Sequence, residues 1–155
     1  MTTAEERVAI EDVIYRYASH IDSGRVGDLE QVLHTDLWAQ YGNAEPIAGR
    51  DRVISWIREA TSTCIWQHHF LRTYHVDVRD DRATALVYHT SYQAFAGDKD
   101  VCQLVGRYHQ ELTRVDGRWV ISRLVFEIVW GERRTDSLGY LASVGGRGPE
   151  VPGWP

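Results

Sequence analysis

The sequence predicts an α+β domain in which a curved antiparallel sheet, shaped as a cone or half barrel, wraps around N-terminal helices. Three observations predict this class. Apolar residues recur at helical spacing early in the chain, the period changes to that of strands near His68, and turn signals separate four long strand-like segments. Helices that precede an antiparallel meander pack on one face of the sheet. The strands are longer than average, which indicates strong curvature and a conical cavity.

The N-terminal part is expected to carry the helices. Thr3 and Glu6 form a capping box at the start of the first helix, which ends near Ser23-Gly24. Its apolar face consists of Ile10, Val13, Ile14, Tyr17, Ala18 and Ile21. We expect a short helix over 27–33, a brief strand over 37–42, a loop over 42–50 and a third helix capped by Asp51.

Four long strands are expected to follow. A tight turn at Asp80-Asp81 joins 69–78 to 83–95, and the strong hairpin signal Asp116-Gly117 joins 101–115 to 118–130. The remaining segment is rich in Gly and Pro. We therefore predict a single α+β cone domain over residues 1–134 and an irregular C-terminal tail over 135–155.

Composition restricts the class of partner. The chain has 155 residues, 43% of them hydrophobic and 25% charged, and its net charge of -5 gives no reason to expect nucleic acid or an anionic membrane. The longest apolar runs fall short of the roughly 20 residues that span a bilayer, and MTTAEERV lacks the pattern of a signal peptide. Two cysteines without CxxC spacing argue against a disulfide framework and a zinc knuckle. We expect a cytoplasmic protein.

The aromatic content indicates a pocket. Six Trp, eight Tyr and seven His suit a mostly apolar cavity with a few hydrogen bonds, although an aromatic core or subunit interface explains them equally well. The sequence has no HxH, HExxH, GxGxxG, P-loop or GxSxG motif. We therefore expect neither a metal nor another cofactor.

Four residues are candidates for acid–base chemistry. Asp22 borders the apolar face of the first helix, where it either ends the helix or orients an imidazole. Tyr17 lies on the same face, in the core or in a cavity. Neighbours in a strand point to opposite faces, so only one of His68 and His69 can enter a given cavity. Periodicity slightly favours His68, because its strand face is the more apolar one. The alternative is that the inward-facing histidine has a structural role only.

Several motifs together resemble the scytalone dehydratase-like group, which is related to the SnoaL-like, polyketide-cyclase-like families of the nuclear transport factor 2-like superfamily. The motifs are "ASHIDSGRVGDLEQV", "QHHF", "GRYHQELTRVDGRWVISRL" and "WGE", and the resemblance extends over residues 5–134. It implies the cone-shaped fold of that superfamily, which hosts dehydratases, dehydrochlorinases, isomerases, cyclases and non-catalytic subunits.

The resemblance also implies site residues. The catalytic histidine of scytalone dehydratase directly precedes a phenylalanine, which favours His69 over His68. The catalytic aspartate corresponds to Asp22, and a pocket tyrosine corresponds to Tyr41. The positions of a second histidine and a pocket asparagine hold other residues here, with Gln93 or Phe95 and Tyr108 nearby.

The site pattern is closest to that of bile-acid 7α-dehydratase. The resemblance aligns its tyrosine, aspartate, histidine and arginine with Tyr17, Asp22, His69 and Arg133. We assign substrate binding to Tyr41, Tyr108, Arg133, Trp56 and Phe95.

These assignments predict a cofactor-independent lyase that eliminates water from a cyclic, partly apolar substrate. His69 would remove a carbon-bound proton, Asp22 would orient it, and Tyr17 would stabilise the enolate or assist hydroxide departure. The same dyad would suit an isomerase or a polyketide-type cyclase. A non-catalytic small subunit, as in ring-hydroxylating dioxygenases, is the alternative from another class. The expected partners are a small-molecule substrate and further copies of the chain in a trimer or dimer, but neither nucleic acid nor membrane.

Overall fold

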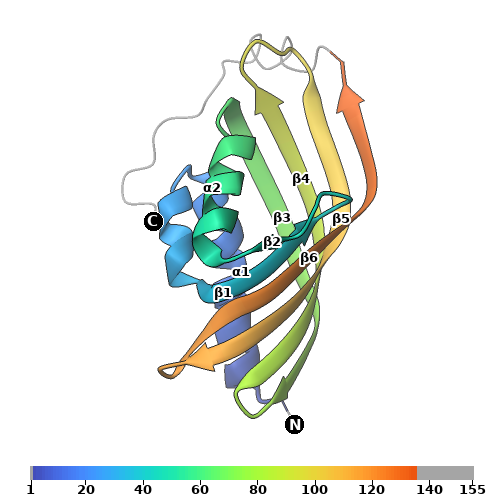
Figure 1. The fold of residues 1–155 in the computed structure, drawn as a ribbon. Coiled ribbons are helices and arrows are strands. Elements are labelled where there is room, and N and C mark those ends of the chain that lie inside the picture. Colours follow the sequence, from blue (N-terminus) through green and yellow to red (C-terminus); the bar gives the residue numbers. More distant parts are fainter. Residues whose placement is uncertain (1, 136–155) are drawn as a thin grey trace, which may run out of the picture.

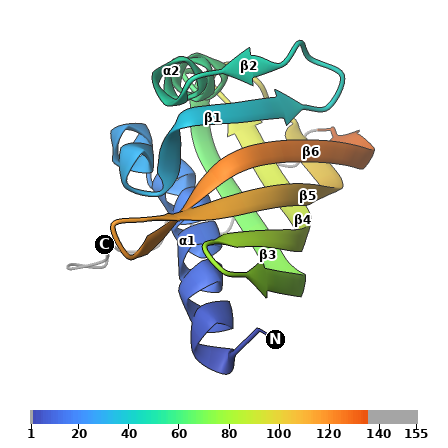
Figure 2. The ribbon, with the colours of Figure 1, turned by 60° about the horizontal axis from the view of Figure 1, so that its bottom comes forward.

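The computed structural model describes residues 2–135, and within this range six strands form one strongly curved sheet (Figure 1). The strand order is β2-β1-β6-β5-β4-β3. In chain order the elements are α1 (Ala4–Asp22), the 3-10 helix η1 (Val26–Gln31), β1 (Leu33–Tyr41), β2 (Ile47–Ala48), α2 (Arg50–Ala60), β3 (Cys64–Arg79), β4 (Arg82–Phe95), β5 (Val101–Val115) and β6 (Arg118–Arg134). All helices lie on one side of the sheet (Figure 1, Figure 2). The predicted α+β cone is confirmed.

Local signals determine both ends of α1. The Thr3 side chain accepts a hydrogen bond from the Glu6 backbone at 3.1 Å, and the Glu6 carboxylate accepts one from the Thr3 backbone at 3.0 Å. At the other end the Ser23 N–H donates back to the helix, and Gly24 has a φ of 73°. The predicted apolar face is buried, so the last residue, Asp22, is held at the wall of the cone.

The β3–β6 meander follows the predicted hairpins, and a register shift between β5 and β6 shapes its concave face. Positive φ at Asp116 and Gly117 is what a type I′ turn requires. The register shifts next to Gly106, where an added Cβ would lie 2.7 Å from the Phe126 ring and 2.2 Å from the Glu127 carbonyl oxygen. Because glycine leaves this space free, the ring can lie across the inside of the sheet.

One part of the predicted sheet is wrong, because the sheet is mixed rather than wholly antiparallel. β1 pairs in parallel with β6, for example Ala39 with Leu124, and β1 begins at Leu33 rather than at 37. Parallel neighbours need a long crossover, and here the crossover includes α2 and the four strands β2 to β5. No local pattern in the sequence encodes that distant pairing.

The other differences lie at the ends of elements. The expected loop over 42–50 contains β2, the short helix is η1, and β3 begins at Cys64. Asp51 does not cap α2. The helix begins after Gly49 without a side-chain cap, and Asp51 in its first turn pairs with Arg50.

Residues 136–155, nearly all of the expected tail, lie outside the described range. The division into a domain over 1–134 and a tail therefore stays a prediction. Among the described residues, no helix is both long and apolar enough to cross a membrane.

Candidate active site

A cavity of about 280 Å³ lies between the concave face of the sheet and the helices α1 and α2. This is slightly smaller than the roughly 300–1,000 Å³ of pockets for drug-sized ligands, so it suits one ring or two fused rings. Apolar and aromatic side chains form most of its wall. The polar side chains on the wall are Tyr17, Tyr41, Tyr108, Thr61, Gln67, His69, His89, Ser91 and Gln93.

Asp22 and His69 form a hydrogen-bonded pair, and His69 is the member of the pair that lines this cavity. The Nδ1 atom of His69 bonds to Oδ1 of Asp22, and the His69 backbone N–H donates to Oδ2 at 2.9 Å. Both carboxylate oxygens are thus fixed, and the His69 side chain is only 7% exposed. Since Nδ1 is occupied by the carboxylate, Nε2 is the ring nitrogen left for a ligand.

His68 points the other way. Its side chain is exposed and lies between aromatic neighbours, with its ring centroid 4.4 Å from that of Phe70 and 6.4 Å from that of Trp66. The slight preference of periodicity for His68 fails, because the apolar face of this part of β3 is the outer one. His69 is the histidine that reaches the cavity, while its catalytic role stays a prediction.

Three tyrosines bring hydroxyl groups to the cavity. The hydroxyls of Tyr17 and Tyr41 lie 2.8 Å apart, and the ring of Tyr108 meets that of Tyr17 edge-on at 6.1 Å. Burial raises the pKa of all three phenols well above the usual value of tyrosine, so they remain protonated donors. Trp56 stacks on Tyr41 with ring centroids 4.5 Å apart and closes the wall beside them.

His89 is a cavity residue that we did not predict. It is 3% exposed, and its ring centroid lies 5.2 Å from that of His69 and 4.5 Å from that of Phe126. Burial, together with the nearby imidazole of His69, lowers the pKa of His89 to about 3, so it is neutral at physiological pH. Strand parity in the predicted hairpin could have found it, because His89 shares its face with Ser91, which pairs with His69.

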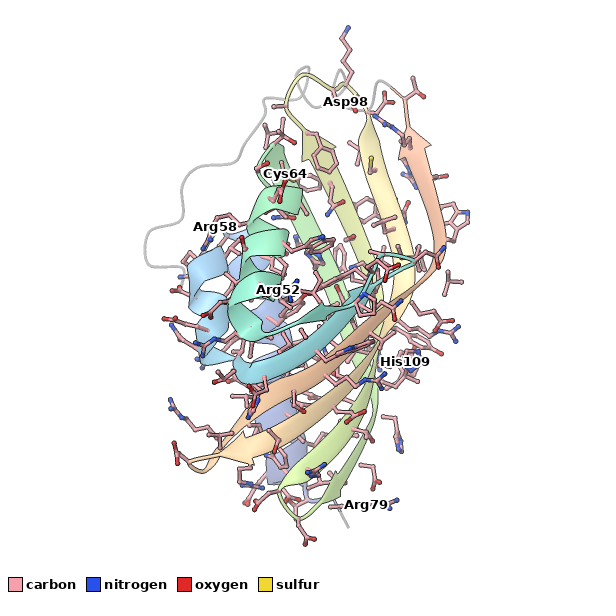
Figure 3. The ribbon with its side chains drawn as sticks, viewed as in Figure 1. Arg52, Arg58, Cys64, Arg79, Asp98 and His109 are labelled. Carbon is pink, nitrogen blue, oxygen red and sulfur yellow. The ribbon has the colours of Figure 1, made fainter. Side chains whose placement is uncertain are left out.

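Arg133 and Phe95 are absent from the lining of the cavity. The Arg133 side chain is 59% exposed and pairs with Asp98 and with Asp100, the latter at 3.4 Å. Asp98 lies in the β4–β5 turn at one end of the sheet (Figure 3). Arg133 stands five residues beyond Ile128, the last cavity residue of β6, which is ~16 Å along a strand. Phe95 is the last residue of β4 and pairs with Cys64. Their assignment to substrate binding therefore finds no support in this geometry.

His109 lies on the outer side of the sheet (Figure 3), where it pairs with Glu127 at 2.9 Å. Within residues 2–135, no three His, Cys, Asp or Glu side chains converge as metal ligands would. Among the described histidines of this sheet, His69 and His89 are the two on the cavity wall.

Comparison with known proteins gives one family match and several matches to the whole domain. A family profile described as "SnoaL-like domain" matches residues 2–125. An uncharacterized protein of Mycobacterium tuberculosis is 28% identical over 122 residues, which cover 77% of this chain and 83% of that protein.

Solved structures show the same fold. A protein of Novosphingobium aromaticivorans with a suggested scytalone dehydratase activity has a TM-score of 0.77 at 20% identity, covering 82% of this chain and 86% of that one. The hexachlorocyclohexane dehydrochlorinase LinA-type3 of Novosphingobium barchaimii has a TM-score of 0.76 at 15% identity, covering 84% and 90%. At these sequence identities the likeness shows a shared fold and nothing beyond it.

Proposed function

This chain belongs to the SnoaL-like domain family, and on that premise we propose that it is a cofactor-independent lyase. It carries out a dehydratase-type elimination on a small cyclic, partly apolar substrate. One observation carries the proposal: the Asp22–His69 pair is fixed by two hydrogen bonds and leaves a ring nitrogen for the cavity.

The first step is removal of a carbon-bound proton. A substrate carbonyl acidifies the neighbouring C–H bond, and Nε2 of neutral His69 accepts the proton. Asp22 holds the imidazole in the tautomer with hydrogen on Nδ1 and stabilises the imidazolium that forms. Because this step needs only a base and an acidified proton, the chemistry requires no redox group.

The tyrosines stabilise the negative charge that moves to the carbonyl oxygen. Tyr17 and Tyr41 share one hydroxyl proton between them, which leaves the other proton free to donate to a ligand. Tyr108 adds a third phenol with a raised pKa. In the second step the electron pair forms the new double bond and the substrate C–O bond breaks. The departing hydroxide takes a proton from the His69 imidazolium and leaves as water.

Elimination is preferred to the other reactions that this dyad could begin. An isomerase or a polyketide-type cyclase would start with the same proton removal, and the product depends on whether a leaving group stands beside the carbanion. The names of two structural neighbours, a dehydratase and a dehydrochlorinase, both describe eliminations. We take this agreement as support for the lyase.

Two substrates with a common product test the choice. Elimination from 3-hydroxycyclohexanone and double-bond shift in cyclohex-3-enone both give cyclohex-2-enone, whose absorbance is easily followed. A lyase converts the hydroxy ketone faster, and His69→Ala abolishes the reaction. Conversion of the enone alone would favour the isomerase, and unchanged turnover in His69→Ala would remove the dyad from the mechanism.

We also propose that the chain assembles with itself, as a trimer or a dimer. The outer face of β3 and β4 exposes large aromatic side chains, among them Phe70 at 59% and Tyr74 at 55%. Exposed apolar patches of this kind mark interaction sites. Light scattering of the purified protein should give a multiple of the chain mass, and Phe70→Ser should lower it. A monomer would instead favour the non-catalytic subunit, whose partner is another protein.

A further inference from the structure

We propose that Gln67 is a specificity-determining residue, which selects substrates that carry a hydrogen-bond donor on the part of the ring system away from the reacting carbon. The donor is a hydroxyl or an N–H group. The inference deepens the proposed lyase function, and where it concerns the reaction it rests on that function. Its test measures binding, so it can stand or fall separately.

The orientation of the Gln67 amide follows from its surroundings. Its Nε2 atom donates to the carbonyl oxygen of Ile21 at 2.8 Å. The reverse orientation would place two acceptor oxygens against each other, so the amide nitrogen is committed to the end of α1. The remaining atom, Oε1, is therefore an acceptor, and it is buried without a hydrogen-bond partner.

The position of Gln67 connects this acceptor to the reaction. Gln67 lines the cavity together with Gln93, which pairs directly opposite it on β4. The next residue of β3 on the same face is His69, at ~7 Å along the strand. A ring whose acidic carbon lies at His69 can therefore place a substituent near Gln67 on its other side.

A substrate with a suitable donor gains selectivity from this arrangement. A buried acceptor without a partner is costly, and a ligand that supplies a donor removes that cost. The terminal torsion of glutamine is broad, so the amide can tilt toward a ligand with little strain. An otherwise identical ligand with a methyl group leaves Oε1 unpaired, and we expect it to bind about tenfold to a hundredfold more weakly.

The experiment compares a matched pair of ketones by isothermal titration calorimetry. The probes are 6-hydroxy-1-indanone and 6-methyl-1-indanone, which differ in the donor and hardly in size. The wild-type protein should prefer the hydroxy compound at least tenfold, and Gln67→Leu should bring the ratio close to one. Because the ratio is taken within each protein, a general weakening of the cavity in the variant affects both probes alike.

Two control variants complete the design. Gln40 also donates its amide to a backbone carbonyl, that of Ala44 at 3.3 Å, but it does not line the cavity. Gln40→Leu should keep the preference. His69→Ala should keep it as well while losing turnover, so that failure of the lyase proposal and failure of the Gln67 proposal give different results. Equal affinities in the wild-type protein, or an undiminished ratio in Gln67→Leu, would overturn the inference.

Discussion

The two faces of β3 carry adjacent histidines in contrasting surroundings. On the concave face, His69 is buried against Asp22. It lines the cavity together with Tyr17, Tyr41 and Tyr108. On the convex face, His68 is exposed, and its ring lies between the aromatic rings of Trp66 and Phe70. Hydrophobicity does not distinguish the two faces, because the outer one is also aromatic. What distinguishes them is the end of α1, which brings a carboxylate to the inner face.

The largest expected effect on activity comes from substitutions in the Asp22–His69 pair of the inner face. Asp22→Asn and His69→Ala should each lower kcat/KM by about 10²–10⁴-fold, since the base or its orientation is lost. His68→Ala should stay within about threefold of the wild-type protein, as measured with the same substrate and buffer. If His68→Ala were as damaging as His69→Ala, the two faces would not differ in function.

The inner wall can be tested next at its tyrosines. Tyr17→Phe removes one hydroxyl of the 2.8 Å pair but leaves Tyr41 to donate, so kcat should fall about tenfold to a hundredfold. Tyr15→Phe is the matched control, because Tyr15 is on the same helix and 41% exposed. Similar rates for the two variants would argue against a role of Tyr17 in the chemical step.

His89 gives the inner face a measurable pH dependence of stability. Its pKa of about 3 lies below the ordinary value near 6.5, so the unfolded chain binds a proton that the folded protein refuses. The folded state should therefore lose up to about 1.4 kcal/mol per pH unit as the pH falls below 6.5 toward 3.

Urea unfolding of the wild-type protein and of His89→Phe at pH 6.5 and 5 measures this effect. The wild-type protein should lose about 1.6 kcal/mol more than the variant over that interval, because the unfolded histidine is already half protonated at about pH 6.5. Groups other than His89 titrate in both proteins and cancel in the difference. Parallel pH dependence would mean that His89 is protonated in the folded state.

The smallest effect on turnover is expected on the outer face. Phe70→Ser should leave kcat per chain within about twofold, because the side chain is exposed and outside the cavity, and surface changes cost little stability. Light scattering and kinetics on one sample would separate assembly from catalysis. A large loss of kcat together with dissociation would show that a neighbouring subunit completes the site.

Much of the fold follows from local signals in the sequence. The capping box at Thr3, the apolar face of α1 and the turn at Asp116-Gly117 each concern residues close in the chain, and each has the predicted structure. The pairing of Asp22 with His69 needed more, because 47 positions separate them. Only the resemblance of "QHHF" and "ASHIDSGRVGDLEQV" to a known family brought these two residues together before the structure did.

Other features of the site depend on long-range packing. The parallel pairing of β1 with β6 brings Tyr41 to the wall, and neither strand encodes its partner in its own pattern. His89 looked like any strand residue until the hairpin register placed it beside His69. Arg133 matched a family position, yet β6 continues past the cavity before it reaches this residue. The Arg133 guanidinium forms ion pairs with Asp98 and Asp100 instead.

The sequence by itself determined the fold class, the course of α1 and the type of hairpin turn, because caps, periodicity and turn residues act over a few positions. The tertiary structure alone decided which tyrosines meet and which acceptor is left unpaired, whereas the family resemblance had already favoured His69 as the inward-facing histidine. Those outcomes depend on curvature and register, which sum over the whole sheet and bring distant side chains within hydrogen-bonding distance.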